Sequence, residues 1–239
     1  MSILNDHACS STEAGASSGG EVEAPASASQ PAPARKLRLK VRAERMGETR
    51  QRIARAAYEL HASVGPARTT ISAIAERAGV QRLTVYKHFP DDREIVQACT
   101  AYHRQIDPPP DPAAWRPIAD PEARLRQGLA EVYAYYRRNE SLLSNIERDV
   151  PRVLEQLGNP PPPGLKTFLE LPQRWHAALA EAWTEPTAAS PIHHAALALA
   201  IEFTTWRTLA RGQARPLDDP QVADLMTTLI RCAAQPHPR

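Results

Sequence analysis

Residues 69–89, with the sequence TTISAIAERAGVQRLTVYKHF, constrain the fold of this 239-residue chain more than any other stretch. Thr69 and Thr70 offer hydroxyl groups that can cap a helix N-terminus, and the apolar residues after them recur at helical spacing. Gly79 then favours a left-handed backbone conformation, which ends one helix and turns the chain. Val85 and Phe89 return to the core four residues apart, so the pattern predicts a second short helix.

The second predicted helix presents cationic and hydrogen-bonding side chains on the side away from its apolar residues. These outward side chains are Gln81, Arg82, Thr84, Lys87 and His88, whereas Leu83 fits either side. A glycine turn followed by such a helix is typical of a helix-turn-helix whose second helix enters the major groove of DNA. An ordinary corner between two helices of an all-α domain shares the apolar pattern, but it does not require this outward chemistry.

The segment Ile74–Phe89 reads I-A-x-x-A-G-V-x-x-x-T-V-Y-x-H-F, which resembles the signature of the TetR (tetracycline repressor-like) family of bacterial transcription regulators. The resemblance extends from about Arg45 to about Ala98, roughly a quarter of the chain. It implies an N-terminal three-helix helix-turn-helix domain, followed by a helical C-terminal domain that binds ligands and dimerises. It says little about what the remainder of the chain recognises.

The resemblance also implies roles for individual residues of the motif. It places Arg82 at base edges, where a guanidinium group pairs well with guanine, and Leu83 against a thymine methyl group. Thr84 and Tyr86 match positions that contact phosphates or sugars, although Tyr86 also suits a structural role. The predicted DNA-binding residues are Thr70, Arg82, Leu83, Thr84, Tyr86, Lys87 and His88.

Positive charge gathers on the segment that contains the motif, although the net charge of the chain is only +2. Residues 35–104 hold fifteen Lys and Arg against seven Asp and Glu, whereas residues 1–34 carry four acidic residues and no Lys or Arg. A phosphate-binding surface requires such a concentration of cations. The distribution therefore favours double-stranded DNA as the partner.

Two segments of different composition precede the motif. Residues 1–34 are rich in Ser, Ala, Gly, Glu and Pro, which predicts a disordered tail, because little apolar surface is available to offset the ordering entropy. Residues 35–45 alternate basic and apolar side chains, which predicts a flexible basic arm. Such an arm either follows a phosphate backbone or enters a minor groove, or it is a solvated linker that raises non-specific affinity.

Helical periodicity continues through the rest of the chain and predicts an all-α fold. Residues 46–105 form the expected DNA-binding domain, residues 106–120 a proline-rich, non-helical linker, and residues 121–235 a helical regulatory and dimerisation domain. Outside the motif, helices are expected over residues 45–64, 91–105, 121–143, 145–157, 165–183 and 191–211, and from residue 219 onward. The last two helices are so apolar that they predict a dimerising four-helix bundle, unless both are covered within one subunit.

The C-terminal domain carries weaker signals for a ligand site. Glu202 interrupts an apolar run, and a carboxylate in such a place needs a partner or a cavity. Aromatic residues and a histidine are available to wall a pocket, although each of them also suits a plain core. The predicted ligand-binding residues are Tyr135, Trp175, His176, Glu202, Phe203 and Trp206.

Several functional classes find no support in the residues. Cys9, Cys99 and Cys232 lie far apart, so neither a zinc site nor a disulfide framework is expected, and adjacent His193 and His194 lack the spacing of a helical metal site. Catalytic motifs are not recognisable, so neither an enzyme nor a cofactor is expected. The sequence lacks an apolar run of membrane-spanning length and the pattern of a signal peptide, which predicts a cytoplasmic protein without a membrane partner.

These features predict a homodimeric transcription regulator, a repressor that a small-molecule effector releases from its DNA operator. Effector and operator would favour different conformations of one equilibrium. The alternative is a constitutive dimeric DNA-binding protein whose C-terminal domain only dimerises, and a well-packed C-terminal domain would favour it. The sequence names neither the effector nor the operator.

Overall fold

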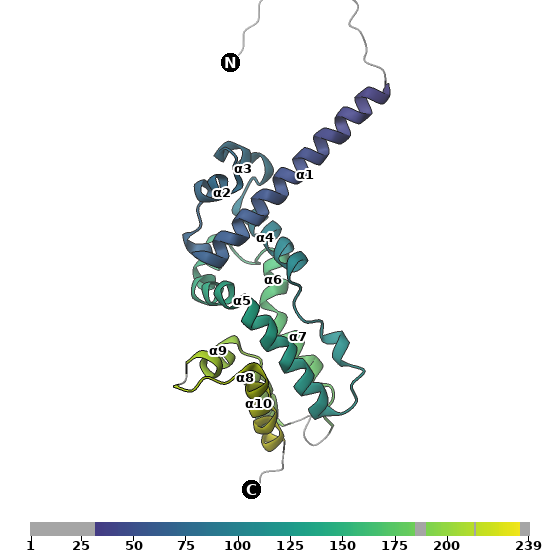
Figure 1. The fold of residues 1–239 in the computed structure, drawn as a ribbon, viewed down its shortest axis with the longest axis vertical. Coiled ribbons are helices and arrows are strands. Elements are labelled where there is room, and N and C mark those ends of the chain that lie inside the picture. The colour runs from purple at the N-terminus through teal and green to yellow at the C-terminus, as the bar shows by residue number, and fades with distance from the viewer. Residues whose placement is uncertain (1–31, 185–189, 213, 235–239) are drawn as a thin grey trace, which may run out of the picture. The chain divides into compact units, whose positions relative to one another are not determined.

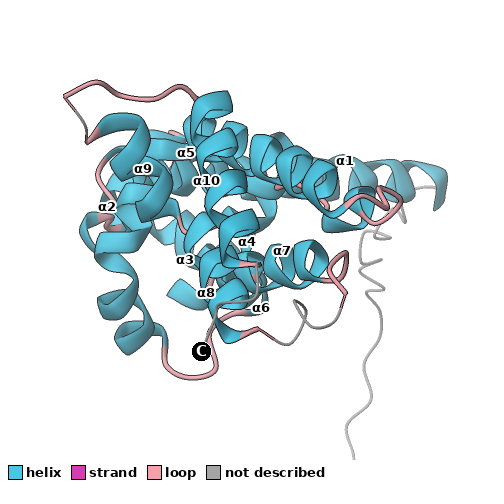
Figure 2. Cartoon of the chain, turned by 90° about the horizontal axis from the view of Figure 1, so that it is seen from below, coloured by secondary structure: helices cyan, strands magenta, loops and turns pink. Residues whose placement is uncertain are grey.

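The computed structural model describes residues 32–184, 190–212 and 214–234. Within these ranges it contains ten α-helices, two 3-10 turns and no β-strand (Figure 1 and Figure 2). The predicted all-α fold class is therefore confirmed. Most of the predicted disordered tail, residues 1–34, lies outside the described residues. Among the helices that are described, none is both long and apolar enough to cross a membrane.

The chain divides into two units, residues 1–42 and residues 43–239. Helix α1 (Ala32–Ser63) contains residues of both units. The predicted start of this helix near Arg45 is wrong, and residues 35–45 are helical instead of forming a flexible arm. Arg, Lys, Leu and Ala all have high helix propensity, so the composition of the segment outweighs its alternating pattern.

The first of the two larger hydrophobic cores joins the helices of the predicted DNA-binding domain. After α1 these helices are α2 (Ile71–Ala78), α3 (Arg82–His88) and α4 (Asp92–Ile106), with a 3-10 turn at Pro66–Arg68. The core residues include Ile53, Ala57, Leu60, Ile74, Val85, Phe89, Ile95 and Cys99. Val64, which helical periodicity also places in the buried stripe of α1, is 37% exposed, because the helix ends at Ser63.

The second larger core is built around one long helix. Its helices are α5 (Pro121–Leu157), α7 (Leu171–Ala180), α8 (Pro191–Ala200), α9 (Phe203–Arg211) and α10 (Asp219–Ala233), while α6 (Pro163–Leu169) packs on α4. Helices α8, α9 and α10 contact one another and lie together in yellow-green in Figure 1. Trp115, in the 3-10 turn Pro112–Trp115, is fully buried in this core. Part of the predicted linker 106–120 therefore forms a 3-10 turn and packs against the core.

The helix boundaries in this region differ from the prediction. The two helices expected over residues 121–143 and 145–157 are one helix, α5, which contains Pro151 in its interior. The helix expected over residues 165–183 is broken between α6 and α7, and Pro172 lies in the first turn of α7, where its missing amide is tolerated.

A second break divides the helix expected over residues 191–211 into α8 and α9. Two buried tyrosines of α5 stabilise this break with their hydroxyl groups. Tyr133 donates to the carbonyl oxygen of Ala200 at 2.7 Å, and Tyr136 donates to that of Ile201. Carbonyl groups at the end of a helix lack intrahelical partners, and these two hydroxyl groups supply the missing hydrogen bonds. The break therefore depends on contacts from a distant helix.

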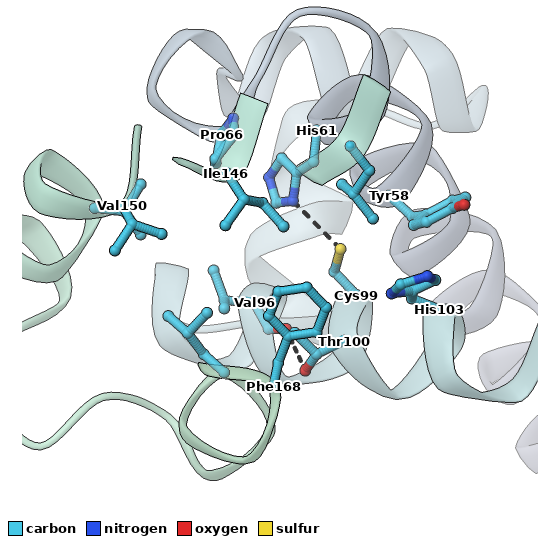
Figure 3. A pocket seen from close by; sticks show the side chains of 13 residues that line it. Tyr58, His61, Pro66, Val96, Cys99, Thr100, His103, Ile146, Val150 and Phe168 are labelled. Carbon is cyan, nitrogen blue, oxygen red and sulfur yellow. Dashed lines mark hydrogen bonds between the residues drawn. The ribbon is translucent and has the colours of Figure 1, made fainter. Parts of the chain in front are cut away.

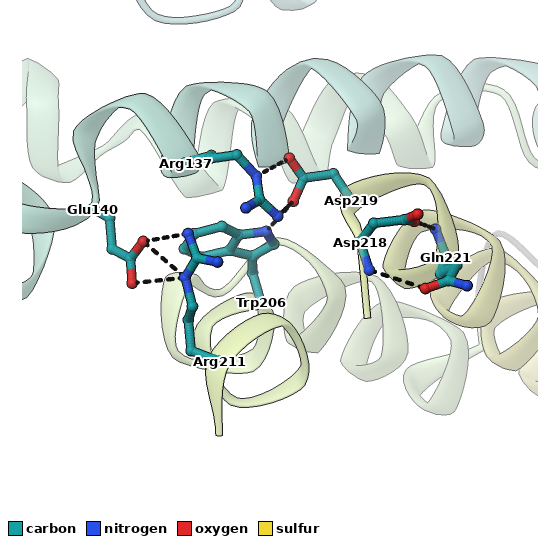
Figure 4. A network of polar contacts seen from close by, with 7 residues as sticks. All are labelled: Arg137, Glu140, Trp206, Arg211, Asp218, Asp219 and Gln221. Carbon is teal, nitrogen blue, oxygen red and sulfur yellow. Dashed lines mark hydrogen bonds and ion pairs between the residues drawn. The ribbon is translucent and has the colours of Figure 1, made fainter. Parts of the chain in front are cut away.

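A polar network joins α5, α9 and α10 around the fully buried Trp206 (Figure 4). The indole N–H of Trp206 donates to Asp219 at 2.9 Å, and Arg137 donates to both oxygens of the same carboxylate at 2.6 Å. The guanidinium groups of Arg137 and Arg211 lie 5.7 and 5.8 Å from the indole ring, and Arg211 pairs with Glu140 at 2.9 Å. Burial by itself raises the pKa of Asp219, but the hydrogen bonds from Arg137 and Trp206 and the nearby arginine charges outweigh it and lower that pKa.

Replacing Asp219 with Asn should lower the free energy of unfolding at pH 7 by about 1.5–3 kcal/mol, because the hydrogen bonds to a charged group disappear. The pKa of Asp219 is lower in the folded than in the unfolded chain. Its contribution is therefore present above the unfolded pKa and disappears as the pH falls through the folded pKa. Urea unfolding at a series of pH values measures the free energy of unfolding of wild type and variant. The difference between the two proteins should become smaller in acid.

The matched control for this experiment is Asp224→Asn, also on α10. The side chain of Asp224 is 68% exposed and its contact with Arg126 is 3.3 Å long, so its removal should change the unfolding free energy little. An equal loss of stability in the two variants would contradict the role assigned to the network around Trp206.

Candidate nucleic-acid interface

Helices α2 and α3 form a helix-turn-helix because the residues around the turn satisfy the backbone locally. The hydroxyl oxygen of Thr70 accepts a hydrogen bond from the N–H of Ala73 at 3.2 Å and caps α2. Gly79 ends α2 at φ 64° and ψ 42°, and a Cβ there would meet no atom within 4 Å. The left-handed conformation itself therefore favours glycine at this position. The N–H of Val80 then bonds the carbonyl of Ala75 at 2.9 Å and closes the turn.

Helix α3 buries one face and exposes the other. Val85, and Phe89 directly after the helix, are fully buried, whereas Leu83 is 62% and Tyr86 41% exposed. Of the predicted DNA-binding residues, Thr70, Arg82, Leu83, Tyr86 and Lys87 are exposed, and Thr84 and His88 are half-buried. The motif therefore leaves these side chains at least partly exposed, and Leu83, which the sequence left open, faces outward.

The cations of α3 are not neutralised within the described part of the chain. The guanidinium group of Arg82 donates to the hydroxyl of Tyr86 at 3.1 Å and lies 5.6 Å from its ring, and this contact involves no acidic group. Neither Arg82 nor Lys87 has an ion pair with a described residue. Both charges are thus available to a phosphate or to the acceptor groups of a base.

Arg50 of α1 fixes the end of α3 and was not identified from the sequence. It donates to the carbonyl oxygen of His88, pairs with Glu94 at 3.4 Å, and lies 4.1 Å from the ring of Phe89. The residue links α1, α3 and α4. In the sequence it is one of many basic residues, and nothing in the local spacing separates it from the others.

Four polar side chains of α5 hold the C-terminal end of α1 and the turn that precedes α2. They are Ser141, Asn145, Arg148 and Asp149, which we call the α5 clamp. The amide nitrogen of Asn145 donates to the carbonyl oxygens of His61 and Ala62 at 3.1 and 2.8 Å. Ser141 also donates to Ala62, and Arg148 donates to Val64. These bonds supply partners to carbonyl groups that a helix end leaves unsatisfied.

Asp149 extends the clamp into the turn itself. Its carboxylate accepts a hydrogen bond from the N–H of Ala67 at 3.1 Å and pairs with Arg148 at 2.7 Å. The hydrogen bond from Arg148 is the main reason that the pKa of Asp149 is lowered. Gly65 has φ 95°, and a Cβ there would lie 2.2 Å from a guanidinium nitrogen of Arg148. The backbone and the clamp are therefore in direct contact a few residues before Thr70.

An apolar cavity of about 50 Å³ lies beside the α5 clamp, between α1, α4, α5 and α6 (Figure 3). In its wall, Nδ1 of His61 and the sulfur of Cys99 are 3.3 Å apart. Burial lowers the pKa of His61 to about 4 and raises that of Cys99 to about 12, so both side chains are neutral at neutral pH. The volume of the cavity exceeds the roughly 10–15 Å³ that one water molecule needs. We call it the apolar cavity.

A second cavity, of about 80 Å³, lies between α4, α5, α6 and α7. Thr100, His103 and Phe168 line both cavities, so the two are neighbours. Arg104 and Arg174 also line the second one, which we call the arginine cavity.

The six predicted ligand-binding residues are not gathered around either cavity. Tyr135 lines the arginine cavity. Trp175 and Trp206 belong to the second core, where their indole groups donate to the carbonyl of Pro110 and to Asp219. The other three lie elsewhere: His176 is 3.4 Å from a ring nitrogen of His194, Glu202 is exposed at the start of α9, and Phe203 stacks on Trp206.

Comparisons with known proteins concern mainly the first part of the chain. Residues 53–99 match the family described as bacterial regulatory proteins, tetR family. The chain is 34% identical over 112 residues to the HTH-type transcriptional regulator TtgR of Pseudomonas putida, a match that covers 46% of this chain and 51% of TtgR. The same values hold for the probable HTH-type transcriptional regulator ArpR of Pseudomonas putida.

A third relative is the HTH-type transcriptional regulator SrpR of Pseudomonas putida, 42% identical over 67 residues, which are 27% of this chain and 32% of SrpR. The chain thus spans about half the length of TtgR and ArpR and about a third of SrpR. No solved structure matches the chain. The helix-turn-helix geometry, the family match over residues 53–99 and these relatives agree: this chain carries the helix-turn-helix region of the tetR family of bacterial regulatory proteins.

Proposed function

We propose that this protein is a dimeric transcription regulator, a repressor that leaves its DNA operator when a small molecule binds. The observation that carries this proposal is α3, which is held by a buried apolar face and exposes cations without an acidic partner among the described residues. An α-helix about 10–12 Å across fits the major groove, which is about 12 Å wide. Helix α3 is accordingly the recognition helix.

The exposed residues of α3 divide into reading and positioning roles. Arg82 reads a guanine with its guanidinium group, and Leu83 contacts a thymine methyl group. Thr84, Tyr86, Lys87 and His88 contact phosphates, sugars or further bases, and Thr70 adds a phosphate contact from the start of α2.

The basic segment that precedes residue 43 supplies attraction rather than reading. Its described residues are helical, and a helix is too wide for a minor groove of about 6 Å. The helical form therefore supports contacts with phosphates, the first of the roles considered for this segment.

The free faces of α8 and α10 support homodimerisation. Ile192 and Leu199 of α8 are each 54% exposed, and Leu225 and Leu229 of α10 are 37% and 48% exposed. The two helices pack on each other, which supports one shared apolar surface made of these side chains. A second copy of the chain would cover it as a four-helix bundle.

The position of α5 supports control by a ligand. Ile146 and Val150 line the apolar cavity, while Asn145 and Asp149, each one residue earlier, belong to the α5 clamp. A ligand that moves this part of α5 also moves the turn before α2. The two cavities favour this function over the constitutive alternative, in which the C-terminal domain only dimerises.

Arg82→Ala should weaken binding to a DNA duplex that the protein itself selects from a random-sequence pool by about 1–3 kcal/mol, because the variant cannot form a bidentate base contact. Binding to unselected DNA should change little. The measurement is a salt titration of affinity for both DNAs. The control is Arg215→Ala, which removes an exposed cation in the connection between α9 and α10. If Arg82→Ala weakens both DNAs equally, Arg82 contacts phosphate and the base reader lies elsewhere.

Deleting residues 1–42 should weaken binding to selected and unselected DNA alike, because it removes Arg35, Lys36, Arg38, Lys40 and Arg42. The slope of log affinity against log salt should become shallower by about 0.9 for each phosphate that the shortened protein no longer neutralises. The cut falls at the boundary between the two units of the chain, so the remaining unit keeps its core. An unchanged slope would show that the segment takes no part in DNA binding.

Replacing Leu225 and Leu229 together with Asp should dissociate the dimer. Two leucines that become buried on association contribute at least about 3 kcal/mol, so the dissociation constant should rise more than about 100-fold. Sedimentation equilibrium measures it. Leu83→Asp is the control, since Leu83 is an exposed leucine outside this surface. A double variant that stays dimeric would exclude α10 from the interface.

A further inference from the structure

The arginine cavity combines an apolar wall with two unpaired cations. Phe168 and Leu171 supply apolar wall, and Arg104 of α4 and Arg174 of α7 line the same space. Both arginines are exposed, and neither has an ion pair or hydrogen bond from its guanidinium group to any described residue. Burial is the main cause that lowers the pKa of His103, the other basic group in the wall, which favours its neutral form. The charge of the wall therefore comes from the two arginines.

A buried hydroxyl group in the same wall also lacks a partner. Tyr135 is 1% exposed, and its hydroxyl makes no hydrogen bond with the described residues. The neighbouring tyrosines of α5 differ, because Tyr133 and Tyr136 both donate to backbone carbonyl groups. An unsatisfied buried hydroxyl is costly, so the arginine cavity offers a donor that an occupant can use.

The size of the cavity limits the occupant. A volume of about 80 Å³ is several times the roughly 10–15 Å³ that one water molecule needs, and about half of the roughly 150 Å³ of a cavity that encloses benzene. A single ring or short chain therefore lies partly inside the cavity, with its polar head at the exposed arginines. A large, multi-ring compound does not fit.

We propose that the arginine cavity binds a small organic anion, whose head group pairs with Arg104 and Arg174 and whose apolar body lies against Phe168 and Leu171. Guanidinium groups bind carboxylates and phosphates through paired, charge-assisted hydrogen bonds. An anion also relieves the repulsion between two cations in one small cavity, which a neutral compound does not. Resting on the function proposed above, this inference gives the effector its chemical class.

The shared wall explains how such an anion affects the rest of the protein. Thr100, His103 and Phe168 line both cavities, and the apolar cavity adjoins the part of α5 that carries the clamp. A ligand body against Phe168 therefore contacts a side chain that also faces the apolar cavity (Figure 3). The path from the anion to the turn before α2 runs from Phe168 across the apolar cavity to Ile146 and Val150, which directly follow the clamp residues Asn145 and Asp149.

The test compares four ligands that share a benzene ring and differ in the charge of the head group. Calorimetric titration of the full-length protein with benzoate, phenyl phosphate, benzamide and benzamidine measures the affinity of each. Benzoate or phenyl phosphate should bind at least about tenfold more tightly than neutral benzamide, the scale of one charge-assisted hydrogen bond, and cationic benzamidine more weakly still. The stronger of the two anions identifies the head group. Equal affinity for all four, or binding of none, would overturn the inference.

Variants locate the bound anion. Arg104→Gln with Arg174→Gln should weaken binding of the stronger anion at least about tenfold, whereas Arg152→Gln, which removes an exposed arginine away from the cavity, should not. Thr167→Trp keeps both arginines and fills the cavity, so it should abolish binding. A Thr167→Trp protein that binds the anion as tightly as wild type would show that the arginines hold it at the surface, contrary to the inference.

Operator binding separates this inference from the function proposed above. If the anion binds with the expected dependence on Arg104 and Arg174 but leaves the affinity for selected DNA unchanged, that result would confirm the anion site and contradict its role as the effector site. If benzamide releases the DNA while neither anion binds, the proposed function as an effector-controlled regulator is supported and the anionic class of the effector is wrong.

Discussion

The hydrogen bonds between α5 and the last carbonyl groups of α1 are the interaction on which the rest of the structure depends. The two larger hydrophobic cores consist of different residues, and the long helix α5 reaches both regions. Asn145 and Ser141 bind the end of α1, and Asp149 binds the turn that leads into α2. Directional bonds of this kind specify a relative position that apolar packing alone would leave adjustable. The position of α2 and α3 relative to α5 thus depends in part on these few residues, together with contacts from α4 such as the hydrogen bond between His103 and Asn139.

Local and long-range contacts share the task of orienting α3. Gly79 sets the angle at its start through a conformation that the backbone requires, and Arg50 holds its end from α1 and α4. Neither residue needs to touch DNA for this purpose. The base reading proposed for Arg82 would depend on such positioning, because a bidentate contact requires both partners in one geometry. Attraction by a basic segment has no such requirement, so the two contributions can reside in different units of the chain.

The features that the sequence predicted well depend on neighbours along the chain. The cap at Thr70, the turn at Gly79 and the alternation of buried and exposed positions in α3 are all properties of short stretches, and the structure has each of them. The break between α8 and α9 was missed, because it depends on hydroxyl groups that α5 supplies. The arginine cavity was missed for the same reason, since Arg104 and Arg174 come to line one cavity only when α6 packs on both α4 and α7. Tyr135 was predicted as an aromatic wall, but its unpaired hydroxyl is visible only in three dimensions.

The neutral pair of His61 and Cys99 has a consequence for the conditions under which the apolar cavity keeps its character. With pKa values of about 4 and about 12, neither side chain changes its charge across the range of pH that a living cell tolerates. The nucleophilic and oxidisable form of cysteine is the thiolate, and that form is suppressed here. Acid stress and mild oxidants would therefore leave this wall chemically unchanged. If the cavity takes part in the ligand response proposed above, that response would depend on what enters the space rather than on the charge of these two side chains.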